Sequence, residues 1–166
     1  VEAAKILHEK NLPVEFHFVG KWSDITEEMF KCALIESHLE DVCFAHGGKY
    51  GKEKDEFWAA ADVFVFPTFY HNECFPLVLL EAMQHHLPCI STTEGGIPGI
   101  IDDKETGFLI EKHDFQTLAD KLEYFIEHPE ESKRMGENGY RKFYDKFTLR
   151  KFEKSMVDIM NDCLKG

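Results

Sequence analysis

Residues 64–81 read FVFPTFYHNECFPLVLLE, and this stretch decides the fold. Residues 63–66 form an apolar run that Pro67 ends, which predicts a short buried strand. A loop with polar residues follows. A helix is then predicted over residues 77–86. Pro76 marks its start, since proline is favoured in the first turn of a helix. A buried strand that leads through a loop into a helix is part of a βαβ unit, so the stretch predicts a parallel sheet.

The same alternation continues on both sides of this stretch. Further strands are predicted at residues 15–19, 42–45, 89–92 and 108–110, and further helices at 1–10, 27–38, 53–61, 115–128, 131–147 and 149–164. Short strands that alternate with helices predict an α/β fold: a Rossmann-like parallel sheet with helices on both faces. Such sheets bind ligands beyond the carboxyl ends of their strands. The C-terminal third lacks a strand pattern and is expected to be helical, and no boundary interrupts residues 1–166, which predicts a single domain.

The usual first strand of such a sheet has no counterpart in the chain. The sequence opens inside a predicted helix and does not begin with Met, so we expect a fragment of a longer polypeptide. In a doubly wound sheet with strand order 3-2-1-4-5-6, the first strand is central. We expect the gap to be closed by direct pairing of residues 15–19 with 63–66, in preference to a strand from a neighbouring molecule. Either outcome would distort the phosphate end of a site there, so weak nucleotide binding is expected.

Composition excludes several classes of function. The net charge of −12 argues against nonspecific nucleic-acid binding and against binding to anionic lipid. No apolar run reaches the roughly 18 residues of a membrane span, so no membrane insertion is expected. The five cysteines are odd in number and form no C-x-x-C pair, which favours free thiols in a reducing cytoplasm.

Two carboxylates lie at the junction of this loop and helix. Glu73 is in the loop, and Glu81 lies about one to one and a half turns into the helix. The free N–H groups and positive dipole at a helix N-terminus suit a diphosphate. A carboxylate near the phosphate could meet a sugar, and a deeper one could accept hydrogen bonds from two ribose hydroxyls. The alternative is that Glu73 caps the helix and Glu81 is a solvated helix residue, and spacing alone leaves both open.

The residues around these carboxylates resemble a family motif. Residues 73–84, ECFPLVLLEAMQ, resemble the E-x7-E motif of the glycogen-synthase-like, family-four retaining glycosyltransferases, which have the two-domain GT-B fold. Residues 57–67 (FWAAADVFVFP), 93–98 (TEGGIP) and 106–110 (TGFLI) resemble further segments of that family in the same order. The resemblance implies the nucleotide-sugar-binding half of a retaining hexosyltransferase. Such an enzyme moves a sugar from a nucleotide-diphospho-sugar to an acceptor hydroxyl without a metal or another cofactor.

The resemblance also implies roles for individual residues. Glu73 would be the catalytic residue that stabilises charge near the anomeric carbon, and Glu81 would bind the ribose diol. The other implied donor contacts are the backbone of Phe75, Leu77 and Val78 at the sugar and diphosphate, the loop of Gly47, Gly48 and Tyr50 at the nucleobase, and Gly95 with Gly96 at the turn that closes the site.

Three departures from the family pattern stand out. Pro76 replaces the family's second glycine, and Gly99 stands where Glu is common. The Arg and Lys near the diphosphate, which follow the family's first strand, have no counterpart, so we expect the isolated fragment to be inactive.

The resemblance implies partners as well. A glycan or lipid-linked acceptor would bind the N-terminal domain, which is absent, and the whole enzyme would serve polysaccharide biosynthesis in the cytoplasm, at the inner membrane face. Two alternatives remain open. One is a nucleotide-sugar epimerase or hydrolase of the same fold, with His71 as a base. The other is a noncatalytic, flavodoxin-like binding module.

Overall fold

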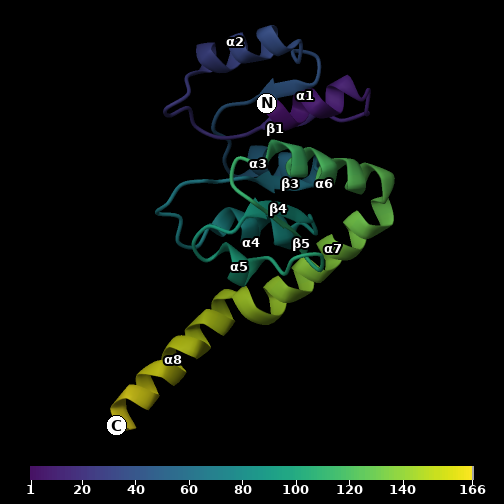
Figure 1. The fold of residues 1–166 in the computed structure, drawn as a ribbon. Helices are drawn as coiled ribbons and strands as arrows, with labels where there is room; N and C mark the ends of the chain where they lie inside the picture. Colours follow the sequence, from purple (N-terminus) through teal and green to yellow (C-terminus); the bar gives the residue numbers. More distant parts are fainter. Residues whose placement is uncertain (166) are drawn as a thin grey trace. The chain divides into compact units, whose positions relative to one another are not determined.

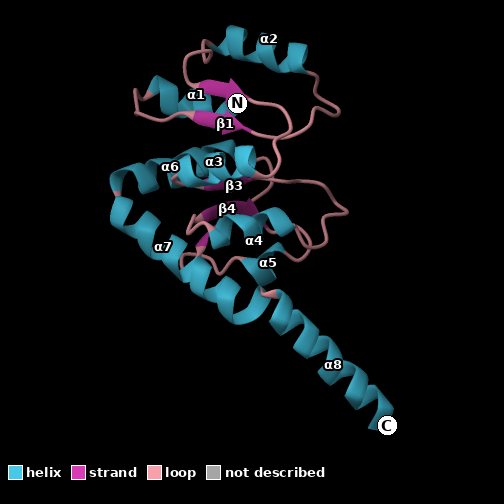
Figure 2. Cartoon of the chain, turned by 180° about the vertical axis from the view of Figure 1, so that it is seen from behind, coloured by secondary structure: helices cyan, strands magenta, loops and turns pink. Residues whose placement is uncertain are grey.

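A computed structural model describes residues 1–165, which divide into two compact units. The first unit holds Val1–Ala60 with His113–His128, and the second holds Ala61–Lys112 with the chain from Pro129 onward. Helices and parallel strands alternate as far as the fifth strand, and the chain after it is helical (Figures 1 and 2). The predicted α/β class and the helical C-terminal third are therefore confirmed. The single domain expected over residues 1–166 stays a prediction.

The first unit contains a two-stranded parallel sheet. Its elements are α1 (Glu2–Glu9), β1 (Phe16–Phe18), α2 (Glu27–Ser37), β2 (Cys43–Ala45), α3 (Lys52–Ala60) and α6 (Phe115–Glu127). Phe16 and Phe18 of β1 pack into a cluster with Phe30 and Leu34 of α2. The ring of His17 points to the opposite face, as alternation along a strand requires, and lies 6.3 Å from the ring of Phe57 in α3. Helices thus cover both faces of this sheet, as the sequence predicts.

The second unit contains a three-stranded parallel sheet in the order β3-β4-β5. Its elements are β3 (Phe64–Phe66), α4 (Leu77–Gln84), β4 (Cys89–Thr92), α5 (Ile97–Ile100), β5 (Gly107–Ile110), α7 (Pro129–Lys142), the π-helical turn η1 (Phe143–Phe147) and α8 (Leu149–Lys165). β4 is the central strand, and all four of its residues are buried. The four-residue helix α5 is absent from the sequence-based prediction.

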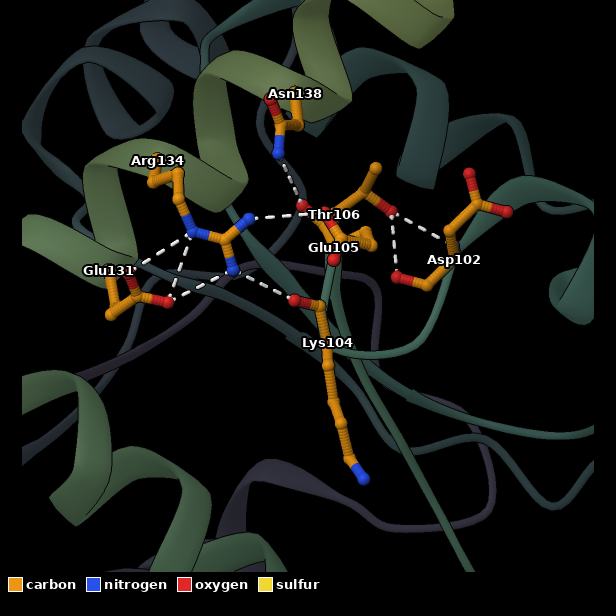
Figure 3. A network of polar contacts seen from close by, with 7 residues as sticks. All are labelled: Asp102, Lys104, Glu105, Thr106, Glu131, Arg134 and Asn138. Atoms are coloured by element: carbon orange, nitrogen blue, oxygen red, sulfur yellow. Dashed lines mark hydrogen bonds and ion pairs between the residues drawn. The ribbon is translucent and has the colours of Figure 1, made fainter.

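Helix α7 is attached to the loop that leads into β5 (Figure 3). The guanidinium group of Arg134 binds the carboxylate of Glu131, that of Glu105 at 3.1 Å, and the carbonyl of Lys104 at 2.9 Å. The amide of Asn138 donates to the carbonyl of Glu105 at 3.1 Å. These bonds join α7 to the sheet at the end where β5 begins, away from the carboxyl ends of the strands.

The pairing that was expected to close the sheet is wrong. In the part of the chain that the structure describes, β1 pairs with β2, and β3 pairs with β4. The physical reason is that β1 and β3 belong to different compact units, and each is held by the packing of its own unit. A strand supplied by a neighbouring molecule, the other expected outcome, stays a prediction.

Helix α4 ends earlier than predicted. The sequence predicts a helix through His86, but α4 ends at Gln84, and His86 has a left-handed backbone with φ 56°. The carbonyl of His86 lies so close to α7 that a β-carbon at Gly136 would stand 2.0 Å from it. Helix α7 thus packs closely against the chain just after the end of α4.

The described residues of α8 are all exposed. None of the helices in residues 1–165 has both the length and the apolar character that crossing a membrane requires.

Candidate functional site

The candidate site is built on the loop that joins β3 to α4, at the carboxyl end of the second unit's sheet. Two buried hydroxyls of β4 fix the start of this loop. Ser91 Oγ donates to the carbonyl of Phe66 at 2.6 Å, and Thr92 Oγ1 donates to the carbonyl of Thr68 at 2.5 Å. The central strand therefore holds the first residues of the loop at two points, and this fixes where the rest of the loop begins.

Glu73 and the Gly95–Gly96 turn are in direct backbone contact. The N–H of Gly96 donates to the carbonyl of Cys74 at 2.7 Å, and the N–H of Glu73 donates to the carbonyl of Tyr70 at 2.9 Å. A β-carbon on Gly96 would lie 2.5 Å from the carbonyl oxygen of Cys74. The turn therefore requires glycine, and the structure brings together three of the residues that the sequence assigns to the donor site.

The N-terminus of α4 follows directly. Pro76 is the N-cap residue, and α4 has no side-chain cap, so the alternative that Glu73 caps this helix is not supported. The backbone N–H groups of the first turn include those of Leu77 and Val78, which a helix leaves without intrahelical partners. Leu77 and Phe75 are both exposed, so this end of α4 lies at the surface of the second unit, where a ligand can approach it.

Glu81 lies in the second turn of α4. It is half-buried between the buried residues Leu80 and Ala82. It stands four residues after Leu77, which places it about 6 Å deeper along the helix axis. The structure thus puts the two carboxylates at different depths beside one helix terminus, and their roles stay predictions.

A buried carboxylate beside the turn escaped the sequence analysis. Glu94, the residue before Gly95, is only 8% exposed, and it forms an ion pair with Lys112 at the end of β5. The carbonyl of Glu94 also accepts the N–H of Ile97 at 3.0 Å. An acidic residue beside two glycines in a turn is ordinary, so the local sequence gives no sign that Glu94 is buried and paired with a cation. That cation is 18 positions away in the sequence.

The loop assigned to the nucleobase belongs to the first unit. Gly47 has φ 68°, which favours glycine, and Tyr50 is 65% exposed. The ammonium group of Lys21 lies 5.9 Å from the centre of the Tyr50 ring, and its Cγ would be 3.3 Å from a β-carbon on Gly48. Lys21, which the sequence analysis did not single out, thus packs on this loop. Contact of the loop with a base stays a prediction.

Two histidines at the root of that loop also escaped notice. His17 Nδ1 lies 2.9 Å from His46 Nε2, and one of these nitrogens must donate to the other. Partial burial, and then the nearby His17 and Lys49, lower the pKa of His46 below its ordinary value. Partial burial, assisted by these neighbours, therefore favours a neutral His46 in the folded chain.

His71 and the cysteines have simpler surroundings. The His71 ring is exposed and lies 5.6 Å from the ring of Tyr70 at a tilted angle. Cys43 and Cys89 are buried, and burial raises the pKa of the Cys89 thiol to about 12. Cys74, next to Glu73, is exposed. Within residues 1–165, no three His, Cys, Asp or Glu side chains gather as a set of metal ligands.

Comparison with known proteins gives the class. The family model for glycosyl transferases group 1 matches residues 1–142, the chain up to the end of α7. The chain therefore belongs to the glycosyl transferases group 1 family. A curated relative is the capsular polysaccharide biosynthesis glycosyltransferase CapM of Staphylococcus aureus, 32% identical over 117 residues, which are 70% of this chain and 30% of CapM. The chain spans about a third of the length of the curated relatives it matches.

Solved structures show the same fold. Sucrose-phosphate synthase from Thermosynechococcus elongatus superposes with a TM-score of 0.83 at 22% identity, over 99% of this chain and 42% of that one. HepE from Anabaena, solved in complex with UDP and glucose, also gives 0.83, at 18% identity, over 96% of this chain and 44% of its own. These neighbours confirm the GT-B type of fold that the sequence predicts.

Proposed function

We propose that this chain is the donor-binding part of a glycosyltransferase that moves a hexosyl group from a nucleotide-diphospho-sugar to an acceptor hydroxyl. The observation that carries the proposal is the junction of loop and helix in the second unit. Glu73 stands before the uncapped N-terminus of α4, its backbone is in contact with the Gly95–Gly96 turn, and Glu81 lies one turn deeper. Membership of the glycosyl transferases group 1 family supports the same reading.

The chemistry of this junction suits such a donor. Departure of a nucleoside diphosphate leaves positive charge at the anomeric carbon, and a carboxylate held nearby stabilises that charge. The N–H groups of Phe75, Leu77 and Val78, together with the helix dipole, favour the diphosphate. The Glu81 carboxylate can accept both hydroxyls of the ribose. The complex of HepE with UDP and glucose lends support to a ligand of this class.

We propose further that the sugar is transferred with retention of configuration. Glu73 then acts as an electrostatic participant, and the leaving phosphate takes the proton of the acceptor hydroxyl. The acceptor is a glycan or a lipid-linked saccharide that binds outside this chain, by analogy with the capsular polysaccharide role of CapM. A cytoplasmic location, at the inner membrane face, agrees with the five cysteines that are free in the structure.

Kinetics of the full-length enzyme with Glu73→Ala and Glu81→Gln test the proposal. Glu81→Gln is expected to weaken UDP binding by about 1–3 kcal/mol, the scale for hydrogen bonds to a charged group. Glu73→Ala is expected to lower kcat much more than nucleotide affinity. Glu111→Gln, an exposed residue after β5, is the matched control and should change neither.

Two outcomes would contradict these assignments. If Glu81→Gln leaves the nucleotide affinity unchanged, Glu81 does not bind the ribose. If Glu73→Ala weakens the binding of UDP alone as much as it lowers kcat, Glu73 does not act at the sugar. The anomeric configuration of the product, read by NMR, tests retention. A product of epimerisation or hydrolysis with no glycoside formed would favour the alternative activity.

A further inference from the structure

The loop that carries Glu73 also displays two aromatic rings. Phe69 is 62% exposed and Tyr70 is 58% exposed, and both precede Glu73 by a few residues. Exposed aromatic side chains on a loop at the carboxyl end of a sheet, beside a candidate site, offer apolar surface to a ligand. The proposed roles of Glu73, Glu81 and the α4 N-terminus make no use of either ring.

Hydrogen bonds hold the backbone that carries Tyr70 in a defined place. The Thr68 carbonyl accepts the buried hydroxyl of Thr92 at 2.5 Å, and Thr68 Oγ1 accepts the N–H of Tyr70 at 3.2 Å. The carbonyl of Tyr70 in turn accepts the N–H of Glu73 at 2.9 Å. One chain of hydrogen bonds thus runs from the central strand through Tyr70 to Glu73, so the Tyr70 backbone and the Glu73 backbone are fixed together.

The chemistry of exposed rings at this point fits a sugar. A pyranose ring presents a face of C–H groups, and an aromatic face is electron-rich, so the two stack while the hydroxyls stay at the rim. The rim here is polar, because the amide of Asn72 lies 3.5 Å from the Tyr70 hydroxyl. A loop backbone that is already held by hydrogen bonds loses less conformational entropy when a ligand binds.

We propose that Phe69 and Tyr70 form a stacking platform for a pyranose ring beside Glu73. The proposal rests on the proposed function and deepens it by naming the residues that select a sugar at this site. The shared chemistry is the apolar face of a hexopyranose. It can come from the sugar of the donor or from a saccharide acceptor, and the experiment separates these two sources.

NMR of the aromatic rings of this chain tests the platform, with methyl α-D-glucopyranoside, UDP and UDP-glucose as separate probes. The variants are Phe69→Leu and Tyr70→Leu, which keep an apolar side chain but remove the ring, and Tyr70→Phe, which keeps the ring. Matched controls are Tyr144→Leu and Phe152→Leu, because these rings are 64% and 61% exposed and lie outside the loop.

The platform predicts that the glycoside or UDP-glucose shifts the ring signals of Phe69 and Tyr70. Tyr70→Leu should weaken the binding of that ligand by about three- to tenfold, the scale of one lost aromatic contact. Tyr70→Phe should retain binding, and both controls should leave it unchanged. If Tyr70→Leu weakens the binding of UDP-glucose but not of UDP, the platform binds the donor sugar. If it weakens the binding of the free glycoside alone, the platform binds an acceptor. Either result supports the platform.

Three results would overturn the proposal. The first is the absence of any ring shift at Phe69 and Tyr70 with both the glycoside and UDP-glucose. The second is an equal loss of UDP and UDP-glucose in Tyr70→Leu, which would mean that the rings stack on the base. The third is a fall in the Tm of Tyr70→Leu well beyond that of the controls, which would mean that the ring is structural. Failure of UDP to bind the wild-type chain would count against the proposed function alone, since the glycoside shifts are measured independently.

Discussion

Gly95 lies so close to Glu73 that no side chain fits between them: a β-carbon at position 95 would stand 1.6 Å from the carbonyl oxygen of Glu73. Gly95 also has φ 49°, in the left-handed region that favours glycine. The turn after β4 and the loop after β3 are therefore one packed structure. Any change that moves the turn moves the backbone of Glu73.

Gly95→Ala tests this contact. The clash and the left-handed backbone together should cost about 1–3 kcal/mol of the free energy of unfolding, or displace the loop by the width of a methyl group. Gly99→Ala is the control, because no atom lies within 4 Å of a β-carbon there. Thermal unfolding and the amide NMR signals of residues 70–75 measure both effects. An alanine at 95 that leaves stability and signals as in the wild type would contradict the packing described.

The ion pair of Glu94 and Lys112 gives a second prediction. Lys112→Met leaves a buried carboxylate without its cation, which should cost about 1–3 kcal/mol of stability. The double variant with Glu94→Gln removes the orphaned charge and should recover part of that loss. Urea unfolding of the single and double variants measures the difference. If the double variant is less stable than Lys112→Met, an unpaired Glu94 charge is not what destabilises the single variant.

Helix α7 provides a matched pair of glycines. A β-carbon at Gly136 would lie 2.0 Å from the carbonyl oxygen of His86, whereas one at Gly139 would meet Met83 Cγ at an ordinary 3.4 Å. Gly136→Ala should therefore destabilise the chain clearly. Gly139→Ala should be neutral or stabilising by up to about 1 kcal/mol, because alanine favours a helix. Calorimetry measures the Tm of both variants. Equal Tm shifts in the two variants would contradict the close packing of α7 on the end of α4.

These glycines show where reasoning from sequence stops. A helix is predicted over residues 131–147, but the prediction does not indicate that Gly139 is a buried packing position inside α7. Likewise the pattern of residues 77–86 predicts a helix through His86, while contact with α7 accompanies its earlier end. Local periodicity places the helices and strands well, because short-range chemistry determines them. Close approaches between distant segments leave no local signal.

The candidate site divides in the same way. The motif places Glu73, Glu81 and the two glycines, and the structure brings Glu73 and the glycines into contact. The sequence did not reveal the partnership of Glu94 with Lys112, nor that of His17 with His46, because each joins residues that lie in or just after two different strands. The pairing of β1 with β3 was predicted wrongly, because it was argued from one sheet, whereas the strands belong to two packed units.

The histidine pair predicts a pH dependence. The folded-state pKa of His46 lies below its ordinary value of 6.5, chiefly through desolvation and then through His17 and Lys49. His46 therefore stabilises the fold above pH 6.5, and this stabilisation is lost as the pH falls through the lowered folded value. NMR titration should show the pKa of His46 rising toward its ordinary value in His17→Asn, which removes one of the two neighbouring side chains that lower it. An unchanged titration would mean that His17 does not affect His46.

Binding of a nucleotide sugar at the loop before α4 can be measured through the alkylation of Cys74. Cys74 follows Glu73 and is exposed, while the exposed Cys32 and Cys163 lie on α2 and α8 and serve as internal controls. Iodoacetamide labelling of the chain is followed site by site by mass spectrometry, with and without saturating UDP-glucose, GDP-glucose or ADP-glucose. We expect at least one of these donors to slow the labelling of Cys74 and to leave the rates at Cys32 and Cys163 unchanged. Labelling of Cys74 at the same rate with and without every donor would contradict binding at this loop.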